Sequence, residues 1–373
     1  MAIMLLAVSV VGGFRREIRN KVTGFDAHIS IYPAMQYETD EPIIHYTPEL
    51  QKFLTSRPYI KRADLLITAP VLIKTEKSFK GLYMRGVEKD FDYTFLKKNI
   101  VQGDIPKGNA DILISKNAAD KIGAQANDSV NLYMSDDLKA RKVRVAGIFN
   151  THFDSYDRYF AYSNAGLVRQ LIKLDTLQGA TIDITTDNLD RVPEYNNRLL
   201  GELNKAILDG TINQSLGTMT VQQKGAHYFA WLDLLDINVW VILALMTAVA
   251  LFTLISGMLI LILEKIRFIG VMRSLGATRA LIRNIFIMLA VRVALIGMLT
   301  GGILAMAIIL IQHYTHLIPL NADAYYIDFV PVSLDWLPLV SVPVVFIFIT
   351  WIALILPSQM AGRIRPTRTL RFE

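Results

Sequence analysis

Three long runs of apolar residues lie near the C-terminus of this 373-residue chain. Residues 237–263 carry no charge, residues 284–312 carry only Arg292, and residues 334–357 carry only Asp335. Each run exceeds the roughly 20 residues that an α-helix needs to cross a hydrocarbon core of about 30 Å. The pattern therefore predicts three transmembrane helices, which we number TM2, TM3 and TM4.

The N-terminus carries about half of such a run. Residues 1–11, MAIMLLAVSVV, are apolar but too short to span a bilayer, and no basic segment of a signal peptide precedes them. We expect residues 1–23 to form a truncated first transmembrane helix, TM1, which continues into a stalk helix, with the true start of the protein upstream. The expected fold is thus a membrane protein with four transmembrane helices, the first of which is truncated.

Residues 24–217 have instead the pattern of a soluble domain. Segments that alternate with period two mix with segments of helical period and show no regular βαβ repeat, which predicts an α+β domain between TM1 and TM2. Ser115 is expected to cap the helix that follows it, and residues 218–236 to form a second stalk helix. The expected strands are residues 28–32, 65–74, 79–87, 141–149 and 180–185, and the expected helices are residues 47–56, 116–122, 164–173 and 192–208.

The charges between the apolar runs predict the topology. The loop of residues 264–283 holds five Lys and Arg against Glu264, and the tail of residues 358–373 is rich in arginine, whereas residues 313–333 contain no Lys or Arg. Because cytoplasmic loops carry the excess of Lys and Arg, the first loop and the tail are expected in the cytoplasm, and the α+β domain and residues 313–333 outside it. The basic residues that follow TM1 violate the rule locally: Arg15, Arg16, Arg19 and Lys21.

Composition and charge agree with this division. Only 19% of the residues are charged, against about 25% in soluble domains. The formal charge of +6 comes mostly from residue 237 onward, where 10 Lys and Arg stand against 5 Asp and Glu. The basic bias is therefore a topology signal, and we expect no nucleic-acid partner.

Motifs of catalysis and cofactor binding are absent from the sequence. It contains no phosphate-binding loop, no HExxH, no GxSxG and no cysteine, and its six histidines are scattered. His313 and His316 alone are a poor basis for a metal site. We expect no catalytic, cofactor or metal residue on this chain, so that any energy would enter through a partner.

The loop after TM2 is the most informative segment. Residues 264–286 read EKIRFIGVMRSLGATRALIRNIF. TM2 is expected to continue as a helix to about Ser274, with Gly276 as a left-handed cap and Thr278 as the N-cap of TM3, which makes a rigid basic elbow. The alternative is a plain connecting loop whose arginines serve only topology.

This segment resembles the coupling helix of FtsX/MacB-type, or type VII, ABC transporter permeases. Phe268 alone departs from the pattern, at a position that is usually acidic. The resemblance implies that the elbow binds a cytoplasmic ATPase. The residues it assigns to ATPase coupling are Glu264, Lys265, Arg267, Ile269, Gly270, Val271, Arg273, Leu275, Gly276, Ala277 and Thr278.

Residues 4–31 and 231–265, and the motif of residues 147–149 ahead of Tyr156 and Asp157, further resemble LolC/LolE-type lipoprotein-releasing permeases. That resemblance implies a bacterial inner-membrane protein with a MacB-like periplasmic core, no transmembrane channel, and mechanotransmission from an ABC ATPase dimer that binds ATP and Mg²⁺. It also implies a second permease chain, identical or related, a lipoprotein substrate and a periplasmic carrier. Another substrate, cell-envelope signalling, or a membrane-anchored structural role without an ATPase are the alternatives.

Several residues of the apolar runs invite specific expectations. Arg292 either extends toward the membrane surface or pairs at a permease interface. Gly297, Gly301 and the adjacent Gly302 form a GxxxG pattern that predicts close helix packing, within the chain or across a dimer. Tyr325, Tyr326 and Trp336 are expected to form an aromatic belt at the membrane interface.

Overall fold

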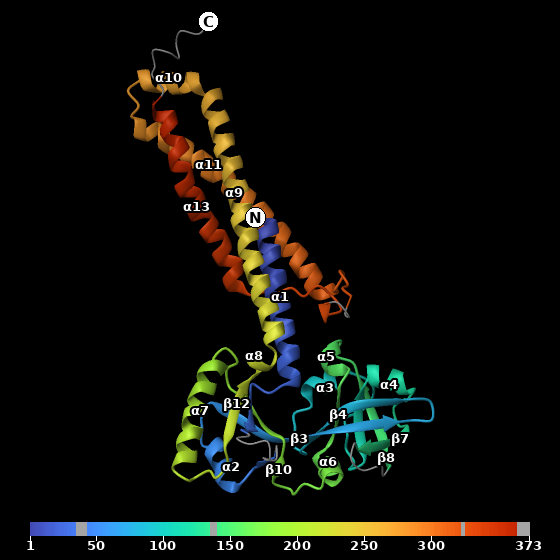
Figure 1. The fold of residues 1–373 in the computed structure, drawn as a ribbon. Helices are drawn as coiled ribbons and strands as arrows, with labels where there is room; N and C mark the ends of the chain where they lie inside the picture. The colour runs from blue at the N-terminus through green and yellow to red at the C-terminus, as the bar shows by residue number, and fades with distance from the viewer. Residues whose placement is uncertain (35–42, 135–139, 322–324, 364–373) are drawn as a thin grey trace. The chain divides into compact units, whose positions relative to one another are not determined.

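The computed structural model describes residues 1–34, 43–134, 140–321 and 325–363, and it divides the chain into two compact units (Figure 1). The helical unit comprises Met1–Glu17, Ala230–Leu320 and the chain from Phe329 onward. The mixed unit comprises Ile18–Phe229 and Asn321–Asp328. Residue 323 and residues 364–373, which entered the charge argument, lie outside the described residues.

The mixed unit is built on a ten-stranded sheet. Along its main path the strand order is β12-β1-β11-β3-β4-β9-β6-β8-β5, and β7 pairs with both β3 and β8. A separate two-stranded sheet joins β2 (Ile44–His45) to β10 (Gln178–Gly179). The strands of the large sheet are β1 (Ile29–Pro33), β3 (Ile60–Lys74), β4 (Phe79–Val87), β5 (Ile100–Gly103), β6 (Asp111–Ser115), β7 (Ser129–Met134), β8 (Arg141–Phe149), β9 (Phe160–Asn164), β11 (Thr181–Thr186) and β12 (Leu216–Thr220).

Strands β3, β4, β9, β6, β8 and β7 pair in a closed ring. The pairs β4–β9 and β6–β8 are parallel and the other four are antiparallel. A closed ring leaves no free edge within itself, so this part of the sheet is a small barrel. Its interior is a cluster of buried aliphatic side chains that includes Ile67, Ile73, Met84, Ile114 and Val145.

A second core lies where β1, β11 and β12 pack against two helices. It contains Ile29, Ile184, Leu54 and Leu199, all fully buried. The 15-residue strand β3 serves both cores, because Leu66 and the residues before it pair with β11, whereas Ile67 and the residues after it pair with β4. The helices of the mixed unit are α2 (Pro48–Thr55), α3 (Thr94–Lys98), α4 (Lys116–Ile122), α5 (Asp154–Asp157), α6 (Ala165–Ile172), α7 (Val192–Leu208) and α8 (Val221–Lys224).

The sequence patterns located these elements unevenly. Strands β4 and β8 and helices α4 and α7 have the predicted bounds, and Ser115 accepts a hydrogen bond from the Ala118 N–H as the predicted N-cap. The second stalk helix was predicted too early, since residues 216–220 form β12. A capping box of Thr220 and Gln223 starts α8, and the long helix begins only after Gly225.

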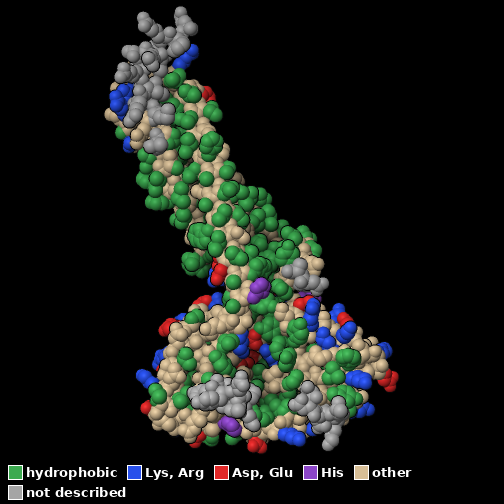
Figure 2. Space-filling model, in the orientation of Figure 1, with side chains coloured by type: hydrophobic (Ala, Val, Ile, Leu, Met, Phe, Trp, Pro, Cys, Tyr) green, Lys and Arg blue, Asp and Glu red, His purple; other side chains and the backbone are tan. Residues whose placement is uncertain are grey.

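The helical unit holds the long helices. They are α1 (Ala2–Phe25), whose last turns belong to the mixed unit, α9 (Ala226–Glu264), α11 (Arg279–Thr315) and α13 (Trp336–Arg363), and the short α10 (Ile266–Ser274) lies between α9 and α11 in the chain. Of the described helices, α9, α11 and α13 are long and apolar enough to cross a membrane, which matches the predicted TM2, TM3 and TM4. Figure 2 shows many apolar side chains along the visible face of the long helices, and charged ones scattered over the mixed unit.

The arginines that break the positive-inside rule have acidic partners. Arg15 pairs with Asp236 at 2.8 Å and Arg16 with Asp335 at 2.6 Å, both within the helical unit. In the mixed unit, Arg19 pairs with Asp190 at 2.6 Å. These cations are thus matched by local carboxylates, which explains their presence beside an apolar helix.

Candidate functional site

The predicted elbow is two turns and a short helix between α9 and α11. TM2 was expected to continue to about Ser274, but α9 ends at Glu264 and the nine-residue α10 starts after a break at Lys265. The break is confined to one residue, because the Lys265 N–H still donates to the Leu261 carbonyl at 3.0 Å. After it, Ile269 and Gly270 lie buried.

The C-terminal end of α10 is a Schellman motif. Gly276 has φ +92°, its N–H donates to the Arg273 carbonyl, and the Ala277 N–H donates to the Met272 carbonyl. Glycine adopts this left-handed conformation without the cost that a side chain brings. Thr278 then accepts a hydrogen bond from the Leu281 N–H at 3.2 Å and starts α11, so the predicted roles of Gly276 and Thr278 as caps are confirmed.

Two faces of α10 differ in exposure. Ile269 belongs to a buried cluster with Met258, Ile262, Ile282, Phe286 and Leu354, which come from α9, α11 and α13, and Ala277 packs against it. On the other side, Phe268, Val271 and Leu275 are 52%, 49% and 79% exposed. Since these three residues recur at i, i+3 and i+7, they form one apolar stripe, which we call the elbow stripe.

The charged residues of the elbow are largely available. Glu264 and Lys265 pair at 3.0 Å, and both side chains are more than half exposed. Arg267 is exposed and Arg273 is half-buried. No carboxylate in the described part of the chain pairs with either arginine. The elbow therefore offers cations and an apolar stripe side by side.

Arg292 and the three glycines singled out within TM3 do not form a common site. Arg292 is exposed on α11 and no described carboxylate pairs with it. A Cβ at Gly301 would lie 3.3 Å from Ala2 N of α1, so here the backbones do approach closely. Gly297 and Gly302 face open space within the described chain, and their part in packing stays a prediction.

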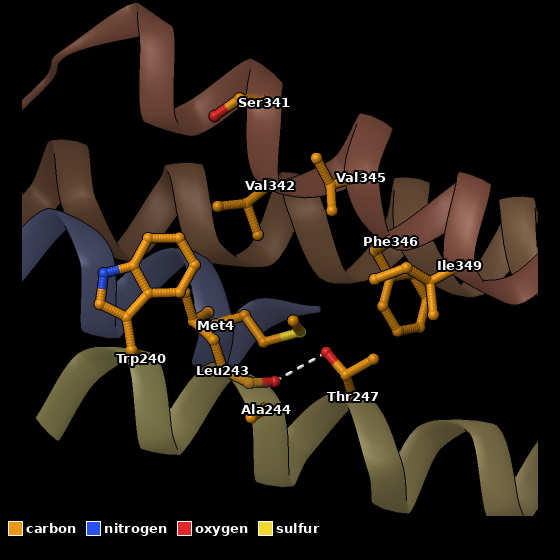
Figure 3. A pocket seen from close by; sticks show the side chains of 10 residues that line it. All are labelled: Met4, Trp240, Leu243, Ala244, Thr247, Ser341, Val342, Val345, Phe346 and Ile349. Carbon is orange, nitrogen blue, oxygen red and sulfur yellow. Dashed lines mark hydrogen bonds between the residues drawn. The ribbon is translucent and has the colours of Figure 1, made fainter. Parts of the chain in front are cut away.

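An apolar groove lies between α1, α9 and α13. Its volume is about 310 Å³. Figure 3 shows Trp240, Leu243 and Thr247 projecting from α9, toward Met4 of α1. The Thr247 hydroxyl donates to the Leu243 carbonyl at 2.7 Å, so that its donor is already satisfied. The other lining residues are Ala244, Ser341, Val342, Val345, Phe346 and Ile349.

An aromatic cluster in the mixed unit, which we call the junction cluster, joins chain segments that lead to the helical unit. It consists of Phe25 at the end of α1, Phe153 and Tyr156 around α5, Tyr228 at the start of α9, and Tyr326. Ring centroids are 4.5 Å apart for Phe25 and Tyr156, 4.7 Å for Phe153 and Tyr228, and 5.2 Å for Phe153 and Tyr326. Burial is the main cause that raises the pKa of the Tyr156 hydroxyl, and the nearby negative charge of Asp26 raises it further. This hydroxyl donates a hydrogen bond to the Asp26 carboxylate.

Tyr326, which was expected in an interfacial aromatic belt, belongs to this cluster, and its place relative to a membrane stays a prediction. Polar contacts secure the same segment: Lys21 Nζ donates to the carbonyls of Thr151 and Tyr326 at 2.6 Å, and His152 Nε2 lies 3.4 Å from Asp328 Oδ1. Sequence reasoning missed the cluster because its members are spread over some 300 residues.

The C-terminal part of the chain matches a known protein family. Residues 240–366, which include the elbow and the apolar helices after it, match the family "FtsX-like permease C-terminal". The predicted resemblance to FtsX-type ABC transporter permeases is thereby confirmed.

Similar proteins that align with nearly the whole chain include lipoprotein-releasing system transmembrane proteins. LolE of Haemophilus influenzae is 25% identical and LolC of Neisseria meningitidis 22% identical, each over 99% of this chain and 91% of the relative. LolC of Xylella fastidiosa is 22% identical over 100% of this chain and 91% of the relative.

Two solved structures overlap with about half of the chain. The extracellular domain of the transporter YknZ from Gram-positive bacteria has a TM-score of 0.37 and 16% identity, covering 52% of this chain and 99% of that one. The periplasmic region of MacB from Actinobacillus actinomycetemcomitans has a TM-score of 0.38 and 14% identity, covering 56% and 95%.

Proposed function

We propose that this chain is the permease subunit of an ABC transporter that releases lipoproteins from the inner membrane toward a periplasmic carrier. The similarity to LolE and LolC proteins along nearly the whole chain supports this function, together with three apolar helices and a large mixed unit. ATP and Mg²⁺ would be bound by a partner ATPase dimer, and this chain would contribute no catalytic residue.

The observation that carries the proposal is the elbow stripe on an anchored helix. Phe268, Val271 and Leu275 are exposed, whereas Ile269 of the same helix is buried against α9, α11 and α13. Exposed apolar side chains rimmed by polar residues mark interaction sites. A force applied to α10 by an ATPase would reach the long helices through the Ile269 cluster.

The junction cluster is the matching element in the mixed unit. α1, α9 and the segment of residues 325–328 each lead from the helical unit to this cluster. Aromatic rings packed at 4.5 to 5.2 Å transmit displacement because close-packed interiors compress little. A movement of the helices would therefore be passed to the mixed unit through α5 and the strands beside it.

The groove of Met4, Trp240 and Phe346 is the best candidate to receive an acyl chain. It is largely apolar, and the two hydroxyls that line it, those of Thr247 and Ser341, each donate to a backbone carbonyl of their own helix. Removing an acyl chain from a bilayer costs about 0.8 kcal/mol for each CH₂, so a transient apolar surface lowers the barrier to extraction. Release would then need neither a hydrophilic channel nor full exposure of the lipid to water.

A second permease chain, identical or related, would cover part of the exposed helices. Only 11% of the most apolar stretch of α9 and of α11 is buried within this chain. Gly297 and Gly302 of α11 leave open space where another helix can approach closely.

Depletion of the protein in its native host tests this function. We expect lipoproteins destined for the outer membrane to accumulate in the inner membrane, as seen by membrane fractionation and immunoblotting. Normal lipoprotein distribution after depletion would contradict lipoprotein release and would favour another substrate or envelope signalling. Co-purification of the chain without any ATPase would instead favour a structural role.

A further inference from the structure

A second groove lies between α11 and α13, close to the elbow. Its volume is about 570 Å³. Arg283, Ile287 and Val291 line it from α11 at a spacing of four residues, which places them on one helix face, and Trp351 and Ile355 line it from α13. Both helices are among those long and apolar enough to span a membrane.

The end of the groove nearest the elbow is cationic and unsatisfied. Arg283 Nε is buried and has no hydrogen-bond partner, and no carboxylate in the described residues pairs with this guanidinium. Arginine stays protonated under all physiological conditions and has no acceptor of its own. The site is therefore suited to an anion with oxygen acceptors, and the neighbouring Asn284 side chain can add an amide donor.

The rest of the groove is hydrocarbon. From Arg283 to Val291 the helix rises by about 12 Å, over which Ile287 and Val291 on one side face Trp351 and Ile355 on the other. A free phosphate ion would match Arg283 but would leave these apolar walls uncovered. An acyl chain alone would cover the walls but would leave the guanidinium unpaired.

We propose that this groove binds an anionic phospholipid of the leaflet on the elbow side, with its phosphate on Arg283 and an acyl chain along Ile287 and Val291. A phospholipid carries both groups in the required order, charged at the membrane surface and apolar toward its centre. The net basic elbow nearby favours an anionic headgroup over a zwitterionic one. The site is independent of lipoprotein release and would exist for any substrate of the transporter.

Native mass spectrometry of the full chain in detergent, titrated with phosphatidylglycerol or with phosphatidylcholine of the same acyl chains, tests the proposal. Wild-type protein is expected to bind phosphatidylglycerol about fivefold more tightly, the effect of one basic side chain at a membrane surface. Arg283→Gln should abolish this preference. Arg279→Gln is the matched control, because Arg279 is exposed, does not line the groove, and should leave the preference unchanged.

Two further measurements test whether the lipid lies in the groove and whether its phosphate alone accounts for binding. Met288→Trp, at a lining residue that is 73% exposed and thus tolerant of change, should fill the groove and weaken both lipids. Inorganic phosphate in excess should not displace phosphatidylglycerol from the wild type. Equal binding of the two lipids, equal losses in Arg283→Gln and Arg279→Gln, an unchanged Met288→Trp, or displacement by phosphate would each overturn the proposal.

Discussion

Arg85 and Asp26 form an ion pair inside the mixed unit, with Nη2 and Oδ1 3.1 Å apart and side chains only 10% and 7% exposed. Arg85 Nη1 also donates to the Phe25 carbonyl at 2.7 Å, and its guanidinium lies 4.1 Å from the centre of the Phe160 ring. The pair thereby ties β4 to the end of α1, beside the junction cluster. A buried pair of this kind fixes geometry, and breaking it is costly.

Asp26→Asn is expected to destabilise the mixed unit by about 3–5 kcal/mol, because Arg85 would keep a buried charge without its partner. Hydrogen-exchange mass spectrometry of peptides from β4 and β9 measures this loss. Asp190→Asn is the matched control: Asp190 pairs with Arg19 but is 77% exposed, so its removal should cost less than about 1 kcal/mol. Equal protection from hydrogen exchange in the two variants would show that the buried pair contributes no more to stability than the exposed pair.

Gly13→Ala should destabilise the helical unit by about 1–3 kcal/mol or more, the usual cost of overpacking. A Cβ at Gly13 would lie 2.5 Å from the Pro331 carbonyl, and backbone cannot give way as a side chain can. The same helix is fixed to this segment by the Ser333 N–H, which donates to the Ser9 carbonyl at 2.9 Å.

Thermal unfolding followed by tryptophan fluorescence reports on Gly13→Ala, since all four tryptophans lie in the helical unit. Gly201→Ala in α7 should act in the opposite direction when probed by hydrogen exchange. A Cβ at position 201 would have no atom within 4 Å, so the variant should gain about 0.5–1 kcal/mol of stability from helix propensity. A Gly13→Ala protein as stable as the wild type would contradict the close contact.

Asp111 makes the mixed unit sensitive to acid. Hydrogen bonds from Arg144, assisted by the backbone N–H groups of Gly108 and Lys107, hold the pKa of this carboxyl below its ordinary value in spite of its burial. With the folded pKa below the unfolded one, the stabilisation is present above the unfolded value near 4 and is lost as the pH falls through the folded pKa. Near-ultraviolet circular dichroism during acid titration should show that the signal of the folded protein falls less steeply with pH in Asp111→Asn than in the wild type. Parallel curves would contradict the assignment of this acid sensitivity to Asp111.

Tyr326→Ala should separate ATP hydrolysis from lipoprotein release. Losing its contacts with Phe153 and Tyr228 should lower the opening free energy of residues 325–328 by about 1–3 kcal/mol, which hydrogen exchange detects. Release should fall while ATP turnover persists, because the elbow is untouched. Tyr325→Ala is the control, since Tyr325 is 46% exposed, and equal release by both variants would remove the junction cluster from the mechanism.

The sequence located what depends on local pattern. The three apolar runs, the caps at Ser115, Gly276 and Thr278, and strands with clear alternation such as β8 are encoded in neighbouring residues. Strand β6 was missed, since its five residues are all buried and show no alternation. Strand β12 was taken as helix because its short LGTMT run directly precedes the capping box of α8.

The site shows the same division. The residues of the elbow were evident from the motif, but the break at Lys265, which makes α10 a separate helix, has no glycine or proline to signal it. Which face of α10 is exposed depends on the position of Ile269 against Leu354, some 85 residues away in sequence. The junction cluster and both grooves likewise arise from tertiary packing alone.

We expect the elbow stripe to receive the action of a partner ATPase. The most direct measurement is ATP-dependent transfer of a lipoprotein from inner-membrane vesicles to a soluble carrier, with Leu275→Asp compared with Leu208→Asp. Both leucines are highly exposed, at 79% and 86%, but Leu208 lies at the end of α7 in the mixed unit. Leu275→Asp is expected to abolish transfer and the co-purification of the ATPase, and Leu208→Asp to preserve both. Transfer at the wild-type level by Leu275→Asp vesicles would contradict this role of the elbow stripe.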